Sequence, residues 1–180
     1  MSQIGRISCI EVLNASSHLP IALIALHEIN SGNPSKVFLV FSFLTFFFSF
    51  LYHITYKRSL KVIFRRLDVA SIFWLVPASV FHFLPSSVAI SILSLCIMLS
   101  VPVIRSGAST VFTDVALITL ATACLMLTFV FSDGWKEITL GMIFYGFGLP
   151  FYFNDEQKWS HFVWHIFVIA GWTIHLWAHL

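Results

Sequence analysis

Five polar side chains, set in three separate stretches of otherwise apolar sequence, are of types that together could hydrolyse a carbonyl bond. They are Ser49, His53, Asp68, His161 and His165. Three imidazoles are enough to hold a catalytic zinc ion with a fourth position left for water, and zinc lowers the pKa of that water toward neutrality. The carboxylate of Asp68 can hold or deprotonate the water, while the Ser49 hydroxyl can hydrogen-bond a substrate carbonyl or the developing oxyanion. These residues therefore predict metal-assisted hydrolysis.

The spacing of these residues favours a shared cavity. Ser49 and His53 are four positions apart, as are His161 and His165, and residues four apart lie on one face of a helix. The pair His175 and His179 repeats the same spacing near the C-terminus, so spacing alone is a weak indicator. We expect that pair to lie toward the opposite membrane face. Other polar residues expected near that face border loops, and we interpret them as interfacial or solvated: His27, Glu28, His82, Asp133 and Glu137.

Taken one at a time, the five residues also have ordinary structural explanations. A lone histidine near a membrane interface more often packs or forms an interhelical hydrogen bond than binds a metal. Asp68 alone would suit a helix N-terminus, or an ion pair with Arg65 or Arg66, and Ser49 alone could bond a backbone carbonyl. The joint arrangement, rather than any one residue, favours a site.

Composition indicates the elements that must position these side chains. The 180 residues are 58% hydrophobic and only 10% charged, which is typical of an integral membrane protein and not of a soluble domain. A membrane-spanning helix needs about 20 mostly apolar residues. We therefore predict an all-α fold, a seven-transmembrane helix bundle in which residues 1–180 form a single domain. The predicted helices cover residues 8–29, 36–56, 67–84, 86–104, 111–131, 136–153 and 158–180.

Cysteine usage and net charge exclude other classes of protein. Cys9, Cys96 and Cys124 fall in three different predicted helices without paired spacing, so they indicate neither a disulfide framework nor a thiolate metal site. The net charge of +2 is too small to predict nucleic-acid binding, so we expect no nucleic-acid partner. The predicted partners are the lipid bilayer and a lipid substrate, and the sequence specifies no protein partner.

The basic residues are distributed unevenly between the two predicted faces of the bundle. One face has only Lys36 and Lys136, and the other has Arg6, Lys57, Arg58, Lys61, Arg65, Arg66, Arg105 and Lys158. The positive-inside rule then predicts a cytoplasmic N-terminus and an exterior or lumenal C-terminus. With about 1.5 Å of rise per residue, four of the candidate residues would lie within roughly 10 Å of the cytoplasmic interface: His53, Asp68, His161 and His165. Ser49 would lie one turn deeper.

The motifs resemble a known superfamily. Ser49-Phe-Leu-Tyr-His53, Arg-Arg-Leu-Asp68 and His161-Phe-Val-Trp-His165 are similar to the three signatures of the seven-helix superfamily of alkaline ceramidases, adiponectin-type receptors and muscle-fusion relatives. The resemblance implies zinc bound by His53, His161 and His165, with Ser49 and Asp68 as catalytic partners.

The first predicted helix resembles the alkaline ceramidase branch in particular. Its segment Glu11-Val-Leu-Asn14-Ala-Ser-Ser17-His-Leu-Pro20 is similar to the pattern of glutamate, asparagine, serine and nearby proline in that branch. The implied activity is hydrolysis of the amide bond of ceramide or a related N-acyl lipid, which releases a fatty acid and an amine base.

The sequence departs from the ceramidase pattern in two places, which bear on the expected calcium site and on the assignment to that branch. Alkaline ceramidases share an acidic segment before the first helix that helps bind calcium, whereas residues 1–10 contain no carboxylate. Glu11 alone cannot form a calcium cage, so we do not predict a conserved calcium mechanism. We predict Glu11, Asn14 and Ser17 as polar support or substrate contacts. The connection between His53 and Asp68 is also longer and more basic than in that branch.

The sequence is therefore compatible with three hypotheses of function. The leading one is a zinc-dependent membrane amidase. The second is a receptor-like or membrane-remodelling member of the same superfamily, in which zinc is structural. The third is a lipid esterase or phospholipase, because an activated water does not by itself select amide over ester. The sequence does not specify the chain length of the lipid, the oligomeric state or the host membrane.

Overall fold

The regular structure of this chain is entirely helical throughout the described residues. The computed structural model describes residues 8–107, 110–154, 157 and 159–180. The helices are α1 (Cys9–Asn30), α2 (Lys36–Ile54), α3 (Arg58–Val80), a 3-10 turn η1 (Phe81–Phe83), α4 (Ser86–Ser106), α5 (Thr110–Phe131), α6 (Trp135–Tyr152) and α7 (Ser160–Ala178). The all-α prediction is confirmed for this part of the chain.

Four of the helices are long and apolar enough to cross a bilayer. They are α1, α2, α4 and α5, and each has 19 residues or more. A span of about 20 residues matches the hydrocarbon thickness at about 1.5 Å per residue. Large apolar side chains such as Val111, Phe129 and Val130 are also exposed on α5. These features indicate a membrane-embedded protein.

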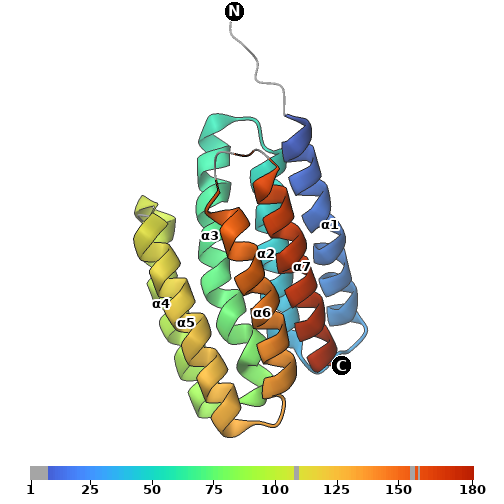
Figure 1. Ribbon diagram of the computed structural model, residues 1–180, viewed down its shortest axis with the longest axis vertical. Coiled ribbons are helices and arrows are strands. Elements are labelled where there is room, and N and C mark those ends of the chain that lie inside the picture. The colour runs from blue at the N-terminus through green and yellow to red at the C-terminus, as the bar shows by residue number, and fades with distance from the viewer. Residues whose placement is uncertain (1–7, 108–109, 155–156, 158) are drawn as a thin grey trace, which may run out of the picture.

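The helices run alternately in opposite directions, so one end of the bundle collects the parts of the chain that carry the motifs. Figure 1 shows the starts of α1, α3 and α7 and the end of α2 at the same end of the molecule. In the packing, α2 lies between α1 and α3, α3 also contacts α4 and α5, and α7 contacts α6 and α1. The ends of α2, α3 and α7 that carry the motifs therefore lie at one end of the bundle.

Helix α3 begins at Arg58, whereas the apolar pattern of the sequence predicts a start at residue 67. Lysine, arginine and leucine are strong helix formers, and their long side chains can keep charges in water while their stems cover apolar surface. The basic run therefore forms the first turns of α3 rather than a connecting loop. The helix also ends early, at Val80, so the prediction of residues 67–84 was wrong at both ends. Asp68 accordingly lies about three turns inside the helix, beyond the reach of its N-terminal dipole.

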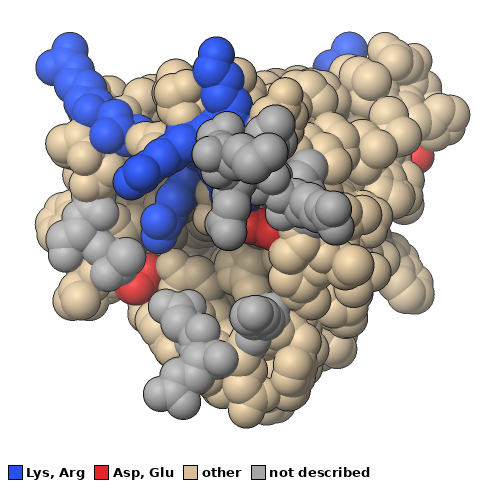
Figure 2. Space-filling view, turned by 90° about the horizontal axis from the view of Figure 1, so that it is seen from above, with Lys and Arg blue, Asp and Glu red and all other residues tan. Residues whose placement is uncertain are grey.

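Positive charge gathers on the end of the bundle that bears the motifs. Figure 2 shows lysine and arginine side chains grouped on one part of this end, where Lys57, Arg58 and Arg65 are exposed. Arg66 donates hydrogen bonds to the carbonyls of Ile104 and Arg105 at the end of α4, where cations are favoured. Two basic residues assigned to this face by the sequence analysis, Arg6 and Lys158, lie outside the described residues.

Small residues allow α6 and α7 to approach closely and fix the position of α7. A Cβ atom at Gly141 would lie 2.2 Å from the ring of His175, and one at Gly171 would lie 2.4 Å from the ring of Tyr145. Close approach at glycine is a common way for membrane helices to gain packing contacts. Across the bundle, Trp172 on α7 is buried and its indole N–H donates to Ser42 Oγ on α2 at 2.8 Å.

Candidate functional site

Histidines from α2 and α7 meet near the basic end of the bundle. His53 lies in the last turn of α2, and His161 and His165 lie in the first turns of α7. The ring centroids of His53 and His161 are 5.3 Å apart, those of His53 and His165 are 5.0 Å apart, and those of His161 and His165 are 4.4 Å apart. The structure thus brings together the three histidines that the sequence motifs singled out.

A fourth histidine, His18 on α1, belongs to the same cluster. Its ring centroid lies 4.1 Å from that of His165 and 6.3 Å from that of His53. Potential ligand nitrogens of His18, His53 and His165 all lie within 4.8 Å of one another, and all three residues are buried. His161 is only half-buried. The inner group of nitrogens therefore includes His18, which no motif predicted.

Several nitrogens in this cluster lack a hydrogen-bond partner among the described residues. Both ring nitrogens of His18 and Nε2 of His53 are buried without one. Buried polar atoms in folded proteins are nearly always paired with another polar group, and a single cation could bind one nitrogen from each of these two rings. Neutral imidazoles on several helices are a donor set that suits zinc. By this criterion, the side chains present fit a zinc ion.

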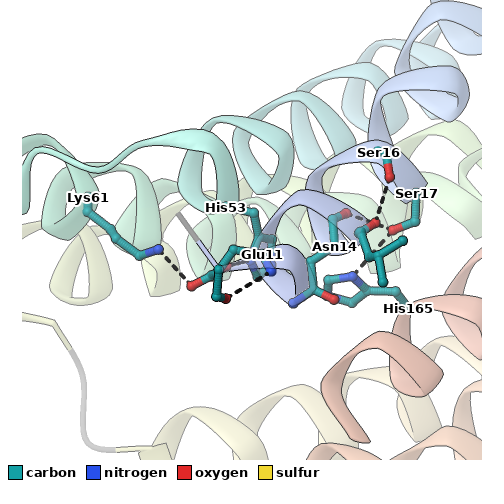
Figure 3. Close-up of polar contacts among 9 residues, drawn as sticks. Glu11, Asn14, Ser16, Ser17, His53, Lys61 and His165 are labelled. Atoms are coloured by element: carbon teal, nitrogen blue, oxygen red, sulfur yellow. Dashed lines mark hydrogen bonds and ion pairs between the residues drawn. The ribbon is translucent and has the colours of Figure 1, made fainter. Parts of the chain in front are cut away.

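A carboxylate on α1 fixes the orientation of His53. The Nδ1–H of His53 donates to Glu11 Oε2 at 2.5 Å, and the Lys61 ammonium donates to Glu11 Oε1 at 2.8 Å; Figure 3 shows the three side chains in a row. Carboxylates bonded to the outer nitrogen of a histidine hold the ring in place and set its tautomer. With Nδ1 used in this way, Nε2 of His53 is the nitrogen left for a ligand role.

A serine on α1 contacts Nδ1 of His165, much as Glu11 contacts Nδ1 of His53. The Ser17 hydroxyl donates to the backbone carbonyl of Asn14 at 2.7 Å, and its oxygen lies 3.4 Å from Nδ1 of His165, as Figure 3 shows. Since the hydroxyl hydrogen is already used, the Ser17 oxygen can accept from Nδ1–H. Nε2 of His165 is then left for a ligand role. The Asn14 side chain is buried, and its Oδ1 has no partner within the described part of the chain.

Ser49 and Asp68 form a pair beside the histidines. Ser49 is buried one turn from His53 on α2, and its side chain interacts with the Asp68 carboxylate on α3. His53 and Arg65 both interact electrostatically with that carboxylate. A hydroxyl next to a carboxylate can donate to it and orient it, so Asp68 is a candidate base beside the imidazole cluster.

The second histidine pair, at the other end of α7, has different surroundings. His175 Nε2 lies 3.1 Å from the carbonyl of Ile138, and His179 Nε2 lies 3.0 Å from the carbonyl of Ser79. His179 Nδ1 also lies 3.0 Å from Ser35 Oγ. These bonds join α7 to α6, to α3 and to the residue before α2. This pair therefore holds helices together, and equal spacing in the sequence leads to two different roles.

Comparison of the chain with protein-family models, with curated proteins and with solved structures gives no match in any of the three. The function must then be inferred from the residues and their geometry.

One functional candidate, His18, was missed by the sequence motifs although a signal for it exists. Glu11, Asn14 and His18 follow one another at intervals of three and four, which places them on a single face of α1. A polar stripe on an apolar helix indicates the face turned toward a polar interior. The stripe does not tell which helices that face meets, so only the fold shows that His18 joins His53 and His165.

Proposed function

We propose that this chain is a multi-pass, zinc-dependent intramembrane lipid hydrolase that cleaves the amide bond of ceramide or a related N-acyl lipid. The observation that carries the proposal is the convergence of His53, His161 and His165 beside the Ser49–Asp68 pair in an apolar helix bundle. Intramembrane ionisable residues are rare and usually functional.

In this proposal the zinc ion is held by imidazoles of His53, His161 and His165. When bound, it supplies a Lewis acid and a water that ionises near neutral pH. Asp68 takes the proton from the attacking water and passes it to the leaving amine. Ser49 orients the Asp68 carboxylate and turns its O–H to the carbonyl oxygen as negative charge develops there. One water is consumed, the C–N bond breaks, and a fatty acid and an amine base are released.

The proposed membrane arrangement has all seven helices spanning the bilayer. The basic end, with Lys57, Arg58 and Arg65, lies on the cytoplasmic side, so the N-terminus is cytoplasmic and the C-terminus exterior or lumenal. The histidine cluster then lies close to one boundary of the hydrocarbon layer. A ceramide-like lipid has its amide group at this depth, while its two chains remain among the apolar helix faces.

A second candidate is a receptor-like or membrane-remodelling protein with a structural zinc ion. It is favoured by the number of histidines in the cluster, since four imidazoles can fill a tetrahedral site and structural zinc sites are closed in this way. Esterase or phospholipase activity at the same residues is the other enzymatic alternative. A positioned base and an activated water serve both ester and amide bonds.

The test is release of fatty acid by purified protein from a panel of ceramides, N-acyl amines and phospholipids. We expect ceramide or N-acyl amine cleavage, and a loss of about 100-fold or more in Asp68→Asn, the usual range for a general base. Ser49→Ala should also lose activity. The matched controls are Ser79→Ala, a buried serine at the far end of α3, and Asp133→Asn, an exposed aspartate; both should retain wild-type rates.

Two results would contradict the proposal. Full activity in both Ser49→Ala and Asp68→Asn would remove their assigned roles. Zinc-loaded protein that hydrolyses none of the lipids would favour the receptor-like alternative, and cleavage restricted to phospholipids would favour the phospholipase.

A further inference from the structure

His18 is a buried histidine whose ring has no polar partner of its own. Its side chain is 3% exposed, and neither Nδ1 nor Nε2 has a hydrogen-bond partner in the residues described. A neutral imidazole carries one donor and one acceptor, and burial without partners is unfavourable for both. Packing alone therefore does not explain why a histidine occupies this position.

Among the described residues, three rings lie close to the ring of His18. Phe46 lies on one side at 5.5 Å between centroids, and His165 and His53 lie at 4.1 Å and 6.3 Å. In both neighbouring histidines, Nδ1 already forms a hydrogen bond with a residue of α1. The partner of His53 is Glu11 and the partner of His165 is Ser17. Their Nε2 atoms are therefore the ones available to the space that the three rings share.

The separation of the nitrogens suits one ion. Two nitrogens that bind zinc at about 2.0–2.1 Å can lie no more than about 4.2 Å apart. The potential ligand nitrogens of His18, His53 and His165 lie within 4.8 Å of one another. Small side-chain adjustments are thus sufficient to bring all three onto one cation.

We propose that His18 is a ligand of the same metal ion that His53 and His165 hold. This inference rests on the metal site of the proposed function and changes one of its ligands: His18 on α1 replaces His161, so three imidazoles hold the ion and a fourth position stays open for water. The cation would then join α1 to α2 and α7. His161, half-buried and one turn nearer the start of α7, lies on the outer side of this inner set.

The experiment measures zinc binding by the full chain, purified in detergent and stripped of metal. Zinc is titrated against a chromophoric chelator to give stoichiometry and affinity, and Co²⁺ is bound separately so that its visible absorption reports the ligand set. The variants are His18→Ala and His18→Phe, of which the second keeps a ring against Phe46 without nitrogens. The controls are His27→Ala, an exposed histidine on the same helix, and His175→Ala, a buried histidine at the far end of α7.

We expect both His18 variants to lose at least about 10-fold in zinc affinity, since even outer-shell substitutions cost 10–100-fold. Their Co²⁺ spectra should change, while both controls keep wild-type affinity and spectrum. Zinc should also raise the thermal midpoint of the wild type more than that of either His18 variant. The midpoints of the metal-free proteins show whether each variant is folded.

The proposal is overturned if His18→Ala and His18→Phe both bind zinc with wild-type affinity and give the wild-type Co²⁺ spectrum. Failure of this inference differs from failure of the proposed function. Zinc binding that depends on His18 without lipid hydrolysis would support the ligand assignment and contradict the enzyme. A wild-type protein that binds no zinc would overturn both.

Discussion

The carboxylate of Glu11 offers the sharpest test of how the histidine cluster is held. It accepts from His53 Nδ1 at 2.5 Å and from Lys61 Nζ at 2.8 Å, but the two contacts have different surroundings. The His53 side chain is 3% exposed, whereas the side chains of Lys61 and Glu11 are 30% and 28% exposed. Removing Glu11 should therefore disturb His53 far more than removing Lys61 does.

The expected magnitudes follow from this difference. Loss of a carboxylate behind a metal-binding histidine typically weakens metal affinity 10–100-fold, which corresponds to about 1.4–2.7 kcal/mol. A partly exposed ion pair is worth about 0–1 kcal/mol, or at most about fivefold in affinity. We therefore expect Glu11→Ala to weaken zinc binding at least 10-fold and Lys61→Ala to weaken it less than fivefold. Glu11→Gln keeps one oxygen acceptor for His53 and should fall between the two.

The assay is the same competitive zinc titration, with the folded state of each variant checked by circular dichroism. Glu28→Ala, a half-buried glutamate at the other end of α1, is the matched control and should bind zinc like the wild type. Equal losses in Glu11→Ala and Lys61→Ala would refute the reasoning, because the contact with the partly exposed lysine would then matter as much as the contact with the buried histidine. Unchanged affinity in Glu11→Ala would refute the orienting role itself.

Three further predictions concern the bundle. Gly141→Ala should lower stability by about 1–2 kcal/mol, because its Cβ would lie 2.2 Å from the His175 ring and overpacking outweighs the better helix propensity. The control is Gly146→Ala, whose Cβ would have nothing within 4 Å and which should be neutral or stabilising. Thermal denaturation in detergent gives the two midpoints, and equal midpoints would contradict the packing argument. Trp172→Phe should cost about 2 kcal/mol, since it leaves the buried Ser42 hydroxyl without its indole donor; an unchanged midpoint would show that the bond contributes little. Removal of metal by a strong chelator should lower the thermal midpoint and addition of zinc should restore it, whereas a midpoint insensitive to both would contradict a bound ion.

The sequence predicted the helical class and most helix positions because apolar runs between short polar connections are a strong signal. The prediction was wrong about the start of α3, because a run of charged residues suits a connecting loop as well as a helix, and Lys61 and Arg65 in fact extend the helix. Within the described part of the chain, four helices meet the length and composition of a membrane span. A seven-span bundle remains a prediction for the other three, in which basic, glycine or histidine residues interrupt the apolar pattern.

The candidate site could be predicted only in part, for a similar reason. Motif spacing placed His53 and His165 on helix faces, but it could not give the rotation of α1 or the helices that its polar stripe meets. His18 was missed for this reason. Lys61 was assigned to membrane topology, and only the fold shows that it reaches Glu11. Contacts between distant segments depend on helix packing, which local patterns do not specify.

The polar contacts of α1 have a consequence for the assembly of the bundle. Among lipid chains, apolar side chains gain little by facing a neighbouring helix rather than the bilayer, so apolar packing discriminates weakly between rotations of a helix about its long axis. Hydrogen bonds are directional. Glu11 bonds to α2 and α3, and Ser17 contacts His165 on α7, so turning α1 by a single residue, about 100°, would break all three contacts. The polar side chains of α1 that contact the candidate site thus also fix the rotation of this helix about its long axis.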